Sequence, residues 1–390
     1  MARRRLLVFG LVGSLVVIGP VLRWTIRRDA PHASVDAHES SSFSEMPSGL
    51  DRASSGGPLG SAPPVEQLPV TVCWKNLAAF DKNLSLANFR AALTAALAAN
   101  DPHLTNYLQE RLTELVGDDP QKALEVVDWA ETSAPPALGV YMEALKKTPA
   151  VQNEEVSERL VGLGESKTAS LEHRSAAIDA LETQRRLSDR ALSRLSAVAM
   201  DETVDSTAWV ATRTLGRVMK EDYARTGSYE RYWKQLLQIG ERSNESAVRL
   251  LALEMPSYSN PLLDRGSMDR LGNILHSDPE RDVREMAAFR LSVTAEPQRA
   301  LEIFRTAFSH EKELCVRWAI VRFAVRAAGE RALPLLAQFA AQDSRFQQDY
   351  LDFKALYAQG TVDFARVWFE KQERHQCPEE GEGEEGRTNG

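Results

Sequence analysis

Apolar residues recur at helical spacing from about residue 75 to residue 360, and short polar turns interrupt them every 10 to 20 residues. A helix packed on both neighbours shows apolar residues at i, i+3, i+4, i+7 and i+8. One stretch follows this pattern without exception, at Val316, Ala319, Ile320, Phe323 and Ala324. No stretch shows the sustained alternation of a strand. The pattern predicts an all-α domain.

The same helical pattern returns at a regular interval. Its first members are 32 to 41 residues apart, at Leu104, Ala137, His173, Thr207, Val248, Val283, Val316 and Gln348. Another apolar helix is predicted between consecutive members, for example over residues 123–130, 192–200 and 300–308. We therefore expect about eight helical hairpins of about 35 residues each, a length typical of stacked helical repeats.

Two segments repeat one helix start. Residues 119–125 (DPQKALE) and 296–302 (EPQRALE) match closely, and in each an acidic residue precedes a proline. Proline is favoured at the first helical position, and an acidic side chain before it can accept hydrogen bonds from the first free amides. We expect Asp119 and Glu296 to cap equivalent helices.

At this point the sequence resembles a known family. Residues 316–324 (VRWAIVRFA), followed by Gly329 and residues 332–336 (ALPLL), resemble a HEAT repeat, and residues 282–288 (DVREMAA) are similar. The resemblance covers about residues 150–345. It implies a right-handed α-solenoid with a protein-binding surface, and it implies no reaction.

The resemblance also implies a ladder of polar contacts along the stack. In HEAT repeats the arginine after the valine opens the second helix and commonly joins this ladder, and the matching positions here are Arg174, Arg249, Arg284 and Arg317. The equivalent positions Thr105, Leu138, Ala208 and Asp349 depart from the pattern. The alternative family is the tetratricopeptide repeat, to which residues 141–149 are similar, but its Trp and Gly-Tyr signature is not found in register.

The four arginines have two interpretations. They are either a basic stripe for an acidic partner or structural groups that bond turn carboxylates such as Asp282 and Glu313 and the ends of neighbouring helices, and we favour the structural one. Trp318 lies next to Arg317 and off the apolar stripe of its helix, so it is a candidate aromatic anchor on an open surface. The other tryptophans are expected mostly in the core.

The N-terminus is predicted to anchor the chain in a membrane. Residues 6–22 carry no charge, and as a helix they span about 26 Å, which is just long enough for a bilayer core of about 30 Å. A cleavable signal peptide has a shorter apolar core and a small-x-small cleavage site, so we expect an uncleaved single-span anchor over residues 1–28. A near tie of flanking arginines, with the free amino terminus added, favours the N-terminus inside and the C-terminal domain in the periplasm or another extracytoplasmic space.

Composition divides the rest of the chain. Residues 29–68 are rich in Ser, Pro and Gly and predict a disordered tether, residues 69–370 hold the repeats, and residues 371–390 predict a disordered acidic tail. Without the six arginines of the anchor, residues 29–390 carry 41 basic and 55 acidic groups, a net charge of -14. This balance argues against a nucleic-acid partner.

No motif for chemistry is present. The sequence has no Gly-rich phosphate loop, no GxSxG and no HExxH, and its seven histidines are scattered. Cys73, Cys315 and Cys377 are in no CxxC pair, so we expect unpaired thiols, with one bridge possible in an oxidising compartment. We predict no catalytic residue, no metal and no cofactor.

The function predicted from these features is a membrane-anchored interaction scaffold with a protein partner. Two alternatives remain open. One is a repeat-containing enzyme, such as a lyase or a modifying enzyme, and the other is a periplasmic module that binds a solute or a glycan.

Overall fold

The computed structural model describes residues 80–201, 206–258, 263–360 and 377. Contacts divide the chain between Leu68 and Pro69, and all described residues belong to the second unit. These residues form helices and no strand, which confirms the predicted all-α class for this part of the chain.

The α-helices are α2 (Leu86–Ala98), α3 (Pro102–Val116), α4 (Pro120–Glu131), α5 (Pro135–Lys147), α6 (Glu154–Glu165), α7 (Leu171–Asp179), α8 (Asp189–Ala199), α9 (Ser206–Thr226), α10 (Glu230–Arg242), α11 (Ser246–Glu254), α12 (Arg265–Ser277), α13 (Arg281–Leu291), α14 (Pro297–His310), α15 (Leu314–Ala328), α16 (Leu333–Gln342) and α17 (Gln347–Ala358). Short 3-10 helices join or extend them: η2 (Pro149–Gln152), η3 (Ala180–Thr183), η4 (Met255–Tyr258), η5 (Gly329–Ala332) and η6 (Ser344–Phe346).

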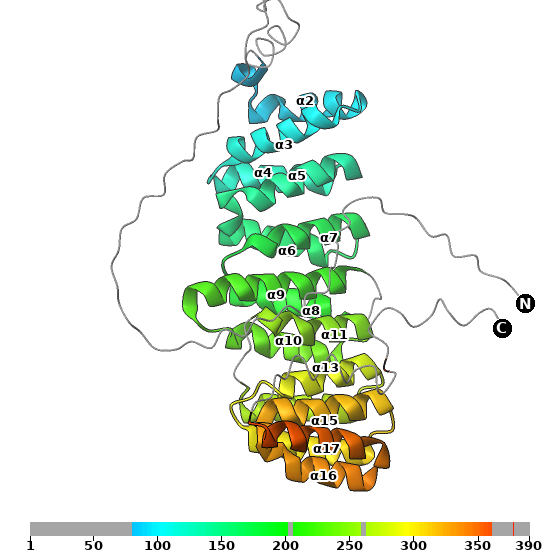
Figure 1. Ribbon diagram of the computed structural model, residues 1–390. Coiled ribbons are helices and arrows are strands. Elements are labelled where there is room, and N and C mark those ends of the chain that lie inside the picture. Colours follow the sequence, from blue (N-terminus) through cyan, green and yellow to red (C-terminus); the bar gives the residue numbers. More distant parts are fainter. Residues whose placement is uncertain (1–79, 202–205, 259–262, 361–376, 378–390) are drawn as a thin grey trace, which may run out of the picture. The chain divides into compact units, whose positions relative to one another are not determined.

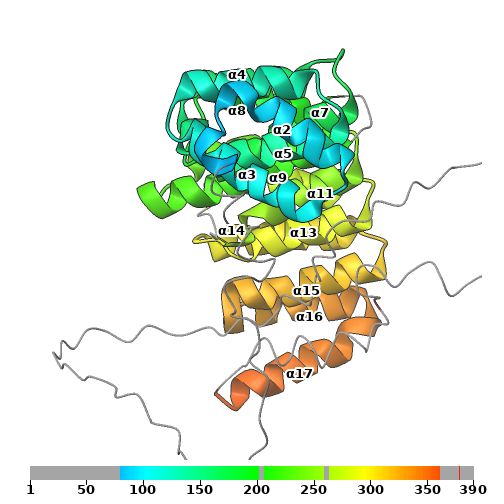
Figure 2. The same ribbon diagram turned by 90° about the horizontal axis from the view of Figure 1, so that it is seen from above.

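The helices pair as hairpins that follow one another in sequence order (Figure 1). Each even-numbered helix packs against the next odd-numbered helix, from α2 with α3 to α16 with α17. From α3 to α15 each odd-numbered helix also packs against the next odd-numbered one, and from α4 to α16 the even-numbered helices do the same, so the hairpins form two layers. Seen from above, α15 lies beside both α13 and α16 (Figure 2). Every predicted first member, from Leu104 to Gln348, falls at the start of an odd-numbered helix.

Small residues let the two layers approach each other closely. Ala287, Ala288, Ala319 and Ala324 have no exposed surface. A Cβ added to Gly164 on α6 would lie 2.5 Å from Cγ1 of Ile178 on α7, which is closer than real Cβ atoms come. This hairpin therefore depends on glycine at position 164.

The two matching helix starts differ in their caps. The side chain of Asp119 accepts hydrogen bonds from the amides of Gln121 and Lys122, at 3.0 and 3.3 Å, as predicted. The prediction for Glu296 was wrong, because its side chain makes no cap bond. It pairs instead with Arg265, and the amide of Glu296 donates to Oγ1 of Thr294.

The last helix turns a different face inward than its pattern predicts. The pattern that starts at Gln348 puts Leu351 and Ala355 at its inward positions i+3 and i+7, but Leu351 is 43% exposed. The buried residues are Phe346, just before α17, and Asp349 and Phe353 on it. Large aromatic rings bury more apolar surface than leucine or alanine would at this end of the stack, so they set the face.

A disulfide joins Cys315, at the start of α15, to Cys377, with their Cα atoms 5.5 Å apart. The expectation of unpaired thiols was therefore wrong for these two residues. This pairing has no signal in the sequence, because the two cysteines are 62 residues apart and α16 and α17 lie between them. The bridge closes a covalent loop that contains the last hairpin, α16 and α17.

The predicted anchor, residues 6–22, lies outside the described residues, as do the predicted tether and, apart from Cys377, the acidic tail. Among the residues that the structure describes, no helix is long and apolar enough to cross a membrane.

The bridge is expected to stabilise the C-terminal hairpin. Closing a loop of this length removes conformational freedom from the unfolded chain, so replacing both cysteines by serine should lower the free energy of unfolding by about 4 kcal/mol. Urea unfolding followed by circular dichroism measures this, with Cys73→Ser as the control. Equal midpoints before and after full reduction, with the free thiols counted, would contradict the prediction.

Candidate functional site

The four arginines named from the sequence open odd-numbered helices and lie at the hairpin turns. We call Arg174, Arg249, Arg284 and Arg317 the arginine ladder. They are on α7, α11, α13 and α15, at equivalent positions of their repeats. Each guanidinium bonds both to its own hairpin and to the next repeat.

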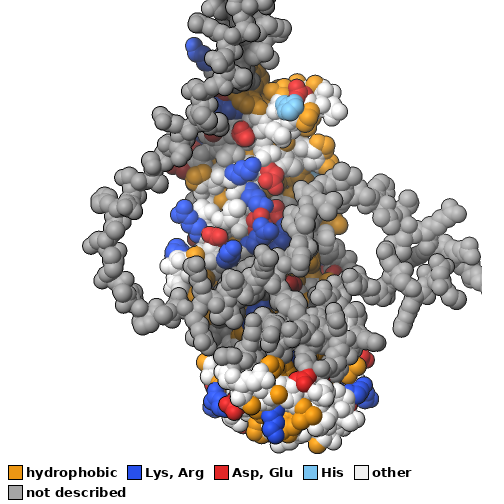
Figure 3. Space-filling model, viewed as in Figure 1, with side chains coloured by type: hydrophobic (Ala, Val, Ile, Leu, Met, Phe, Trp, Pro, Cys, Tyr) orange, Lys and Arg blue, Asp and Glu red, His pale blue; other side chains and the backbone are white. Residues whose placement is uncertain are grey.

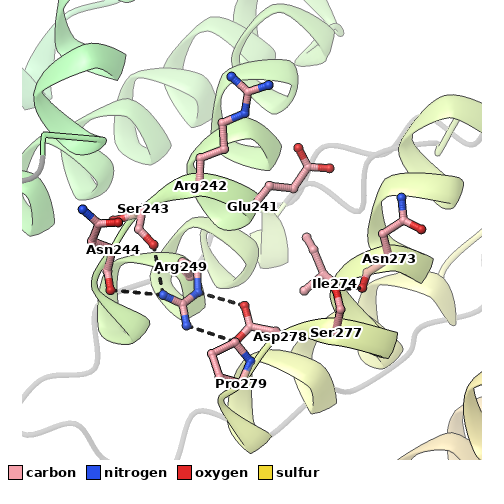
Figure 4. Close-up of a pocket in the computed structure, with 10 residues that line it drawn as sticks. All are labelled: Glu241, Arg242, Ser243, Asn244, Arg249, Asn273, Ile274, Ser277, Asp278 and Pro279. Atoms are coloured by element: carbon pink, nitrogen blue, oxygen red, sulfur yellow. Dashed lines mark hydrogen bonds and ion pairs between the residues drawn. The ribbon is translucent and has the colours of Figure 1, made fainter. Parts of the chain in front are cut away.

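Arg249 shows the geometry of one rung (Figure 4). Its Nε and Nη2 donate to the two carboxylate oxygens of Asp278 at 2.8 and 3.0 Å. Its Nη1 donates to the carbonyl oxygens of Ser243 and Asn244 in its own turn, at 3.0 and 3.3 Å. The side chains of Arg249 and Asp278 are only 9% and 7% exposed, so this two-pronged pair is shielded from water.

The next two rungs repeat this arrangement. Arg284 donates from Nε to Glu311 at 2.8 Å and from Nη1 to the carbonyl oxygen of Asp278 at 2.8 Å. Arg317 donates from Nε to the carbonyl oxygen of Glu311 at 2.7 Å and from Nη1 to Asp343 at 2.9 Å. Asp278 and Glu311 thus each connect two arginines, one through the carboxylate and one through the carbonyl group. The ladder is continuous from α11 to α16.

The carboxylates of the ladder are not the ones expected. Asp282 pairs with Arg281 and not with the ladder, so the expectation for Asp282 and Glu313 was wrong. The acceptors Asp278, Glu311 and Asp343 are the C-cap residues of α12, α14 and α16. Each lies six residues before the ladder position of its own repeat, at Arg284, Arg317 and Asp349, and this spacing could have identified them in the sequence.

The ladder changes character at α9. Ala208 occupies its position there, so no guanidinium is present to reach the following turn. One repeat earlier, Arg174 donates to the carbonyl oxygen of Gly164 and to Oγ1 of Thr207, both at 3.1 Å. Arg174 therefore also joins its own hairpin to the next repeat, here through Thr207 at the start of α9.

Among the acids of the ladder, Asp343 has the most strongly shifted pKa. Bonds from Arg345, and a further bond from Arg317, lower the pKa of Asp343 to about 2, although burial opposes this shift. The carboxylate, whose side chain is 8% exposed, is thereby held ionised. Its charge is matched by the guanidinium of Arg317. The pair therefore joins two repeats, and this carboxylate is not free to act in catalysis.

The turns of α10–α11 and α12–α13 enclose a shallow hollow of about 450 Å³ (Figure 4). Both acids of its wall are already paired, because Arg249 bonds Asp278 and Glu241 pairs with Arg270. Arg242, Asn273 and Ser277 complete part of the wall. No acid and base converge there in the way general acid–base chemistry requires.

Trp318 is not the exposed aromatic. Its side chain is 1% exposed, so the expectation of an open surface anchor was wrong. Among the described tryptophans, the exposed one is Trp209 on α9, at 38%, although most tryptophans were expected in the core. Both residues directly follow a ladder position, Arg317 and Ala208, so they occupy the same position in two repeats.

An ion network that the sequence did not reveal connects three odd-numbered helices. Lys146 on α5 pairs with Asp179 on α7 at 2.9 Å and with Glu182 in η3. From α9, Arg213 pairs with Asp179, and Arg217 pairs with Glu182 at 2.8 Å. Burial alone would lower the pKa of Lys146, but its bonds to both carboxylates outweigh burial and raise it. We call these five residues the odd-helix network.

Three further arginines gather on α13 and α15. Burial lowers the pKa of Arg290 to about 9 and that of Arg322 to about 10, and it also lowers the pKa of Arg326. The guanidinium groups of Arg290 and Arg326 lie 5.1 and 4.5 Å from the ring centroid of Phe289. Arg290 also donates to the carbonyl oxygen of Glu254 at 2.7 Å. These contacts bury positive charge on α13 and α15.

The structure brings together two histidines that are far apart in the sequence. His276 on α12 and His310 on α14 have ring centroids 5.1 Å apart. Two imidazoles alone do not make a metal site, and within the described residues no group of three or more His, Cys, Asp or Glu side chains is placed to hold a metal.

The ladder is expected to carry stability. Arg284→Ala leaves the carboxylate of Glu311 buried without its guanidinium, and breaking such a pair costs about 3 kcal/mol of unfolding free energy. Arg265→Ala is the matched control, since that side chain is 80% exposed and its pair with Glu296 should contribute less than about 1 kcal/mol. Chemical denaturation of both variants measures the difference. Equal losses would show that the ladder has no special role.

The acid at the C-terminal rung predicts a pH dependence. The pKa of Asp343 in the folded protein lies below the ordinary value of about 3.9. The stability that Asp343 adds to the fold is therefore present above pH 4 and is lost as the pH falls towards 2. Asp343→Asn should therefore cost about 2 kcal/mol at pH 7 and almost nothing at pH 2. Urea unfolding across this pH range measures the effect. A constant difference between the two proteins would contradict the assignment.

The comparison with known families agrees with this geometry. Residues 268–348, from α12 to the start of α17, match the family of HEAT repeats. The chain matches no curated protein. With stacked helical hairpins, an arginine ladder at the turns and this match in its C-terminal part, the chain is a HEAT-like repeat protein.

Proposed function

We propose that this protein is a membrane-anchored scaffold that presents its HEAT-like repeats to a protein partner. The observation that carries the proposal is the repeat stack itself. Such stacks display one surface stripe per repeat, and HEAT repeats commonly mediate protein–protein interaction. The ion pairs at the turns hold neighbouring repeats together, which leaves the helix faces for recognition.

The side chains in the described part of the chain favour a scaffold over an enzyme or a module that binds a solute or a glycan. An enzyme would need acid, base or nucleophile side chains that converge in one pocket, whereas both acids of the hollow beside Arg249 are paired with arginines. A glycan-binding module would need several exposed aromatic rings in one groove. In the described part, the large aromatic side chains that are exposed are Trp209 and Tyr223, both on α9.

The disulfide supports an extracytoplasmic location. Bridges such as Cys315–Cys377 form and persist in oxidising compartments and are rare in the cytosol. The uncharged run at residues 6–22 would hold the chain in the membrane with its N-terminus inside. A tether over residues 29–68 would confine the repeats to a shell near that membrane, which raises the effective concentration of partners there.

Crosslinking in the native membrane tests the scaffold function. The full chain should be recovered covalently joined to a protein partner, and the same partner should be recovered in independent preparations. Turnover of a small molecule by the full chain, without any reproducible protein partner, would contradict the proposal.

A reporter fused after Gly390 tests the topology. An enzyme that folds only under oxidising conditions should be active there, because the account places the C-terminus outside the cytoplasm. Activity of a reporter that works only in the cytoplasm would reverse the orientation.

A further inference from the structure

We infer that residues 361–376 form an amphipathic helix that packs along the outer side of α15, antiparallel to α15 and fastened there by the Cys315–Cys377 bridge. This inference concerns the C-terminal end of the stack and does not rest on the scaffold function. Three observations support it. α15 has a second, shielded apolar stripe, both ends of the segment lie beside α15, and the segment has the length and the pattern of a matching helix.

The second apolar stripe of α15 consists of Trp318, Val321 and Val325. They are at i, i+3 and i+7 along the helix, so they share one side of it, and each is 1% exposed. With 3.6 residues per turn, they lie about 180° around the helix from Val316 and Phe323. We call their side the outer side of α15. A helix that is apolar on two opposite sides is buried on both.

The described helices that pack against α15 meet its other sides. On α13, the ring centroid of Phe289 is 5.5 Å from that of Phe323 and 4.5 Å from the guanidinium of Arg326. On α14, the ring centroid of Phe308 is 5.1 Å from the guanidinium of Arg317. Unlike every earlier pair of consecutive odd-numbered helices, α15 and α17 make little contact, and Figure 2 shows α17 at an angle to α15. A further part of the chain therefore shields the outer stripe.

Both ends of the segment lie beside α15. Near the end of α17, the hydroxyl oxygen of Tyr357 is 3.7 Å from the place of a Cβ on Gly329, the residue that follows α15. At the other end of the segment, Cys377 is bonded to Cys315 in the first turn of α15. The segment therefore starts at the C-terminal end of α15 and returns to the N-terminal end, which is an antiparallel path.

The length of the segment matches this path. From Cys315 to Gly329 the helix spans about 21 Å at 1.5 Å per residue, and the 16 residues of the segment span about 24 Å as a helix. The same residues in an extended strand would span about 53 Å, which is more than twice the path. A helix thus reaches from one end of α15 to the other without slack.

The sequence of the segment predicts a helix with one apolar side. Phe364 and Trp368 are one helical turn apart, as are Ala365 and Phe369, so the four residues form one stripe. The charged residues, three acids and three bases, fall on the remaining sides of such a helix: Asp363, Arg366, Glu370, Lys371, Glu373 and Arg374. Because their net charge is zero, apolar contact and not charge would hold the segment on α15.

The surface of the last hairpin offers a poorer match. Figure 3 shows apolar side chains interspersed with basic and acidic ones at the C-terminal end of the stack, where α16 and α17 lie. On α17 the exposed large apolar side chain is that of Leu351. An apolar helix buries more apolar surface on the continuous stripe of α15. The helical part of the domain then extends past residue 370, where the repeats were expected to end.

Photocrosslinking locates the segment. A benzophenone side chain in place of Trp368, half-way along the segment, should join to the middle of α15 within the same chain when the full protein in detergent is irradiated. One in place of Glu370, on the charged side, should not join to α15. Crosslinks from position 368 to another helix, to a second copy or to another protein would overturn the inference, as would equal crosslinking to α15 from both positions.

Trypsin tests whether the segment is packed. Arg366, Lys371 and Arg374 are cleavage sites inside it, and Arg387 in the predicted disordered tail is the reference site. In the full chain the three inner sites should be cut at least about tenfold more slowly than Arg387, because cleavage requires local unfolding. Equal cleavage rates at all four sites would contradict the inference.

Two variants and a control assign the protection to the apolar contact. Trp368→Ala removes the largest apolar side chain of the segment, so it should speed cleavage at Arg366 about tenfold. Val321→Ala on the outer side of α15 should speed it in the same direction, and Glu370→Ala on the charged side should leave it unchanged. Sites in α2–α9 that stay resistant in the same digests show that the repeats remain folded. Unchanged cleavage in both Trp368→Ala and Val321→Ala would rule out this packing.

Discussion

The stack depends on charged hydrogen bonds that pass from one hairpin turn to the next. A helical hairpin cannot bury its apolar faces alone, so each repeat needs its neighbours in a fixed register. From α11 to α16 that register is set by Arg249, Arg284 and Arg317, which reach the C-cap carboxylates of the following repeats. Apolar packing drives the association of neighbouring repeats, but it tolerates small shifts of one helix along another. A bidentate guanidinium–carboxylate pair that is shielded from water does not tolerate such shifts, because its geometry is fixed.

Much of the architecture could be predicted from the sequence, because helical periodicity is a local signal. The repeat positions from Leu104 to Gln348 each fall at the start of an odd-numbered helix, and a ladder arginine follows four of the eight. What could not be predicted depends on residues brought together across repeats. The partners of the ladder, the Cys315–Cys377 bridge and the odd-helix network are all of this kind.

Trp318 and Trp209 show the limit most clearly, since they occupy the same position in two repeats. Exposure is decided by the neighbouring repeats, which periodicity within one helix does not describe. Trp209 is 38% exposed on α9, whereas Trp318 lies in a helix that is buried on most sides, with the guanidinium of Arg322 5.9 Å from its ring centroid. The inward face of α17 was missed for a related reason, because Phe346 packs against Phe308 of another hairpin.

The most direct test of this account is a double-mutant cycle on Arg284 and Glu311. Glu311→Gln keeps an acceptor for the nearby amides and removes the charge, so the cycle isolates the ion pair between two repeats. Free energies of unfolding for the single variants, the double variant and the unaltered protein give the coupling. We predict a coupling of more than about 1 kcal/mol. Losses that simply add would contradict the central role of the ladder.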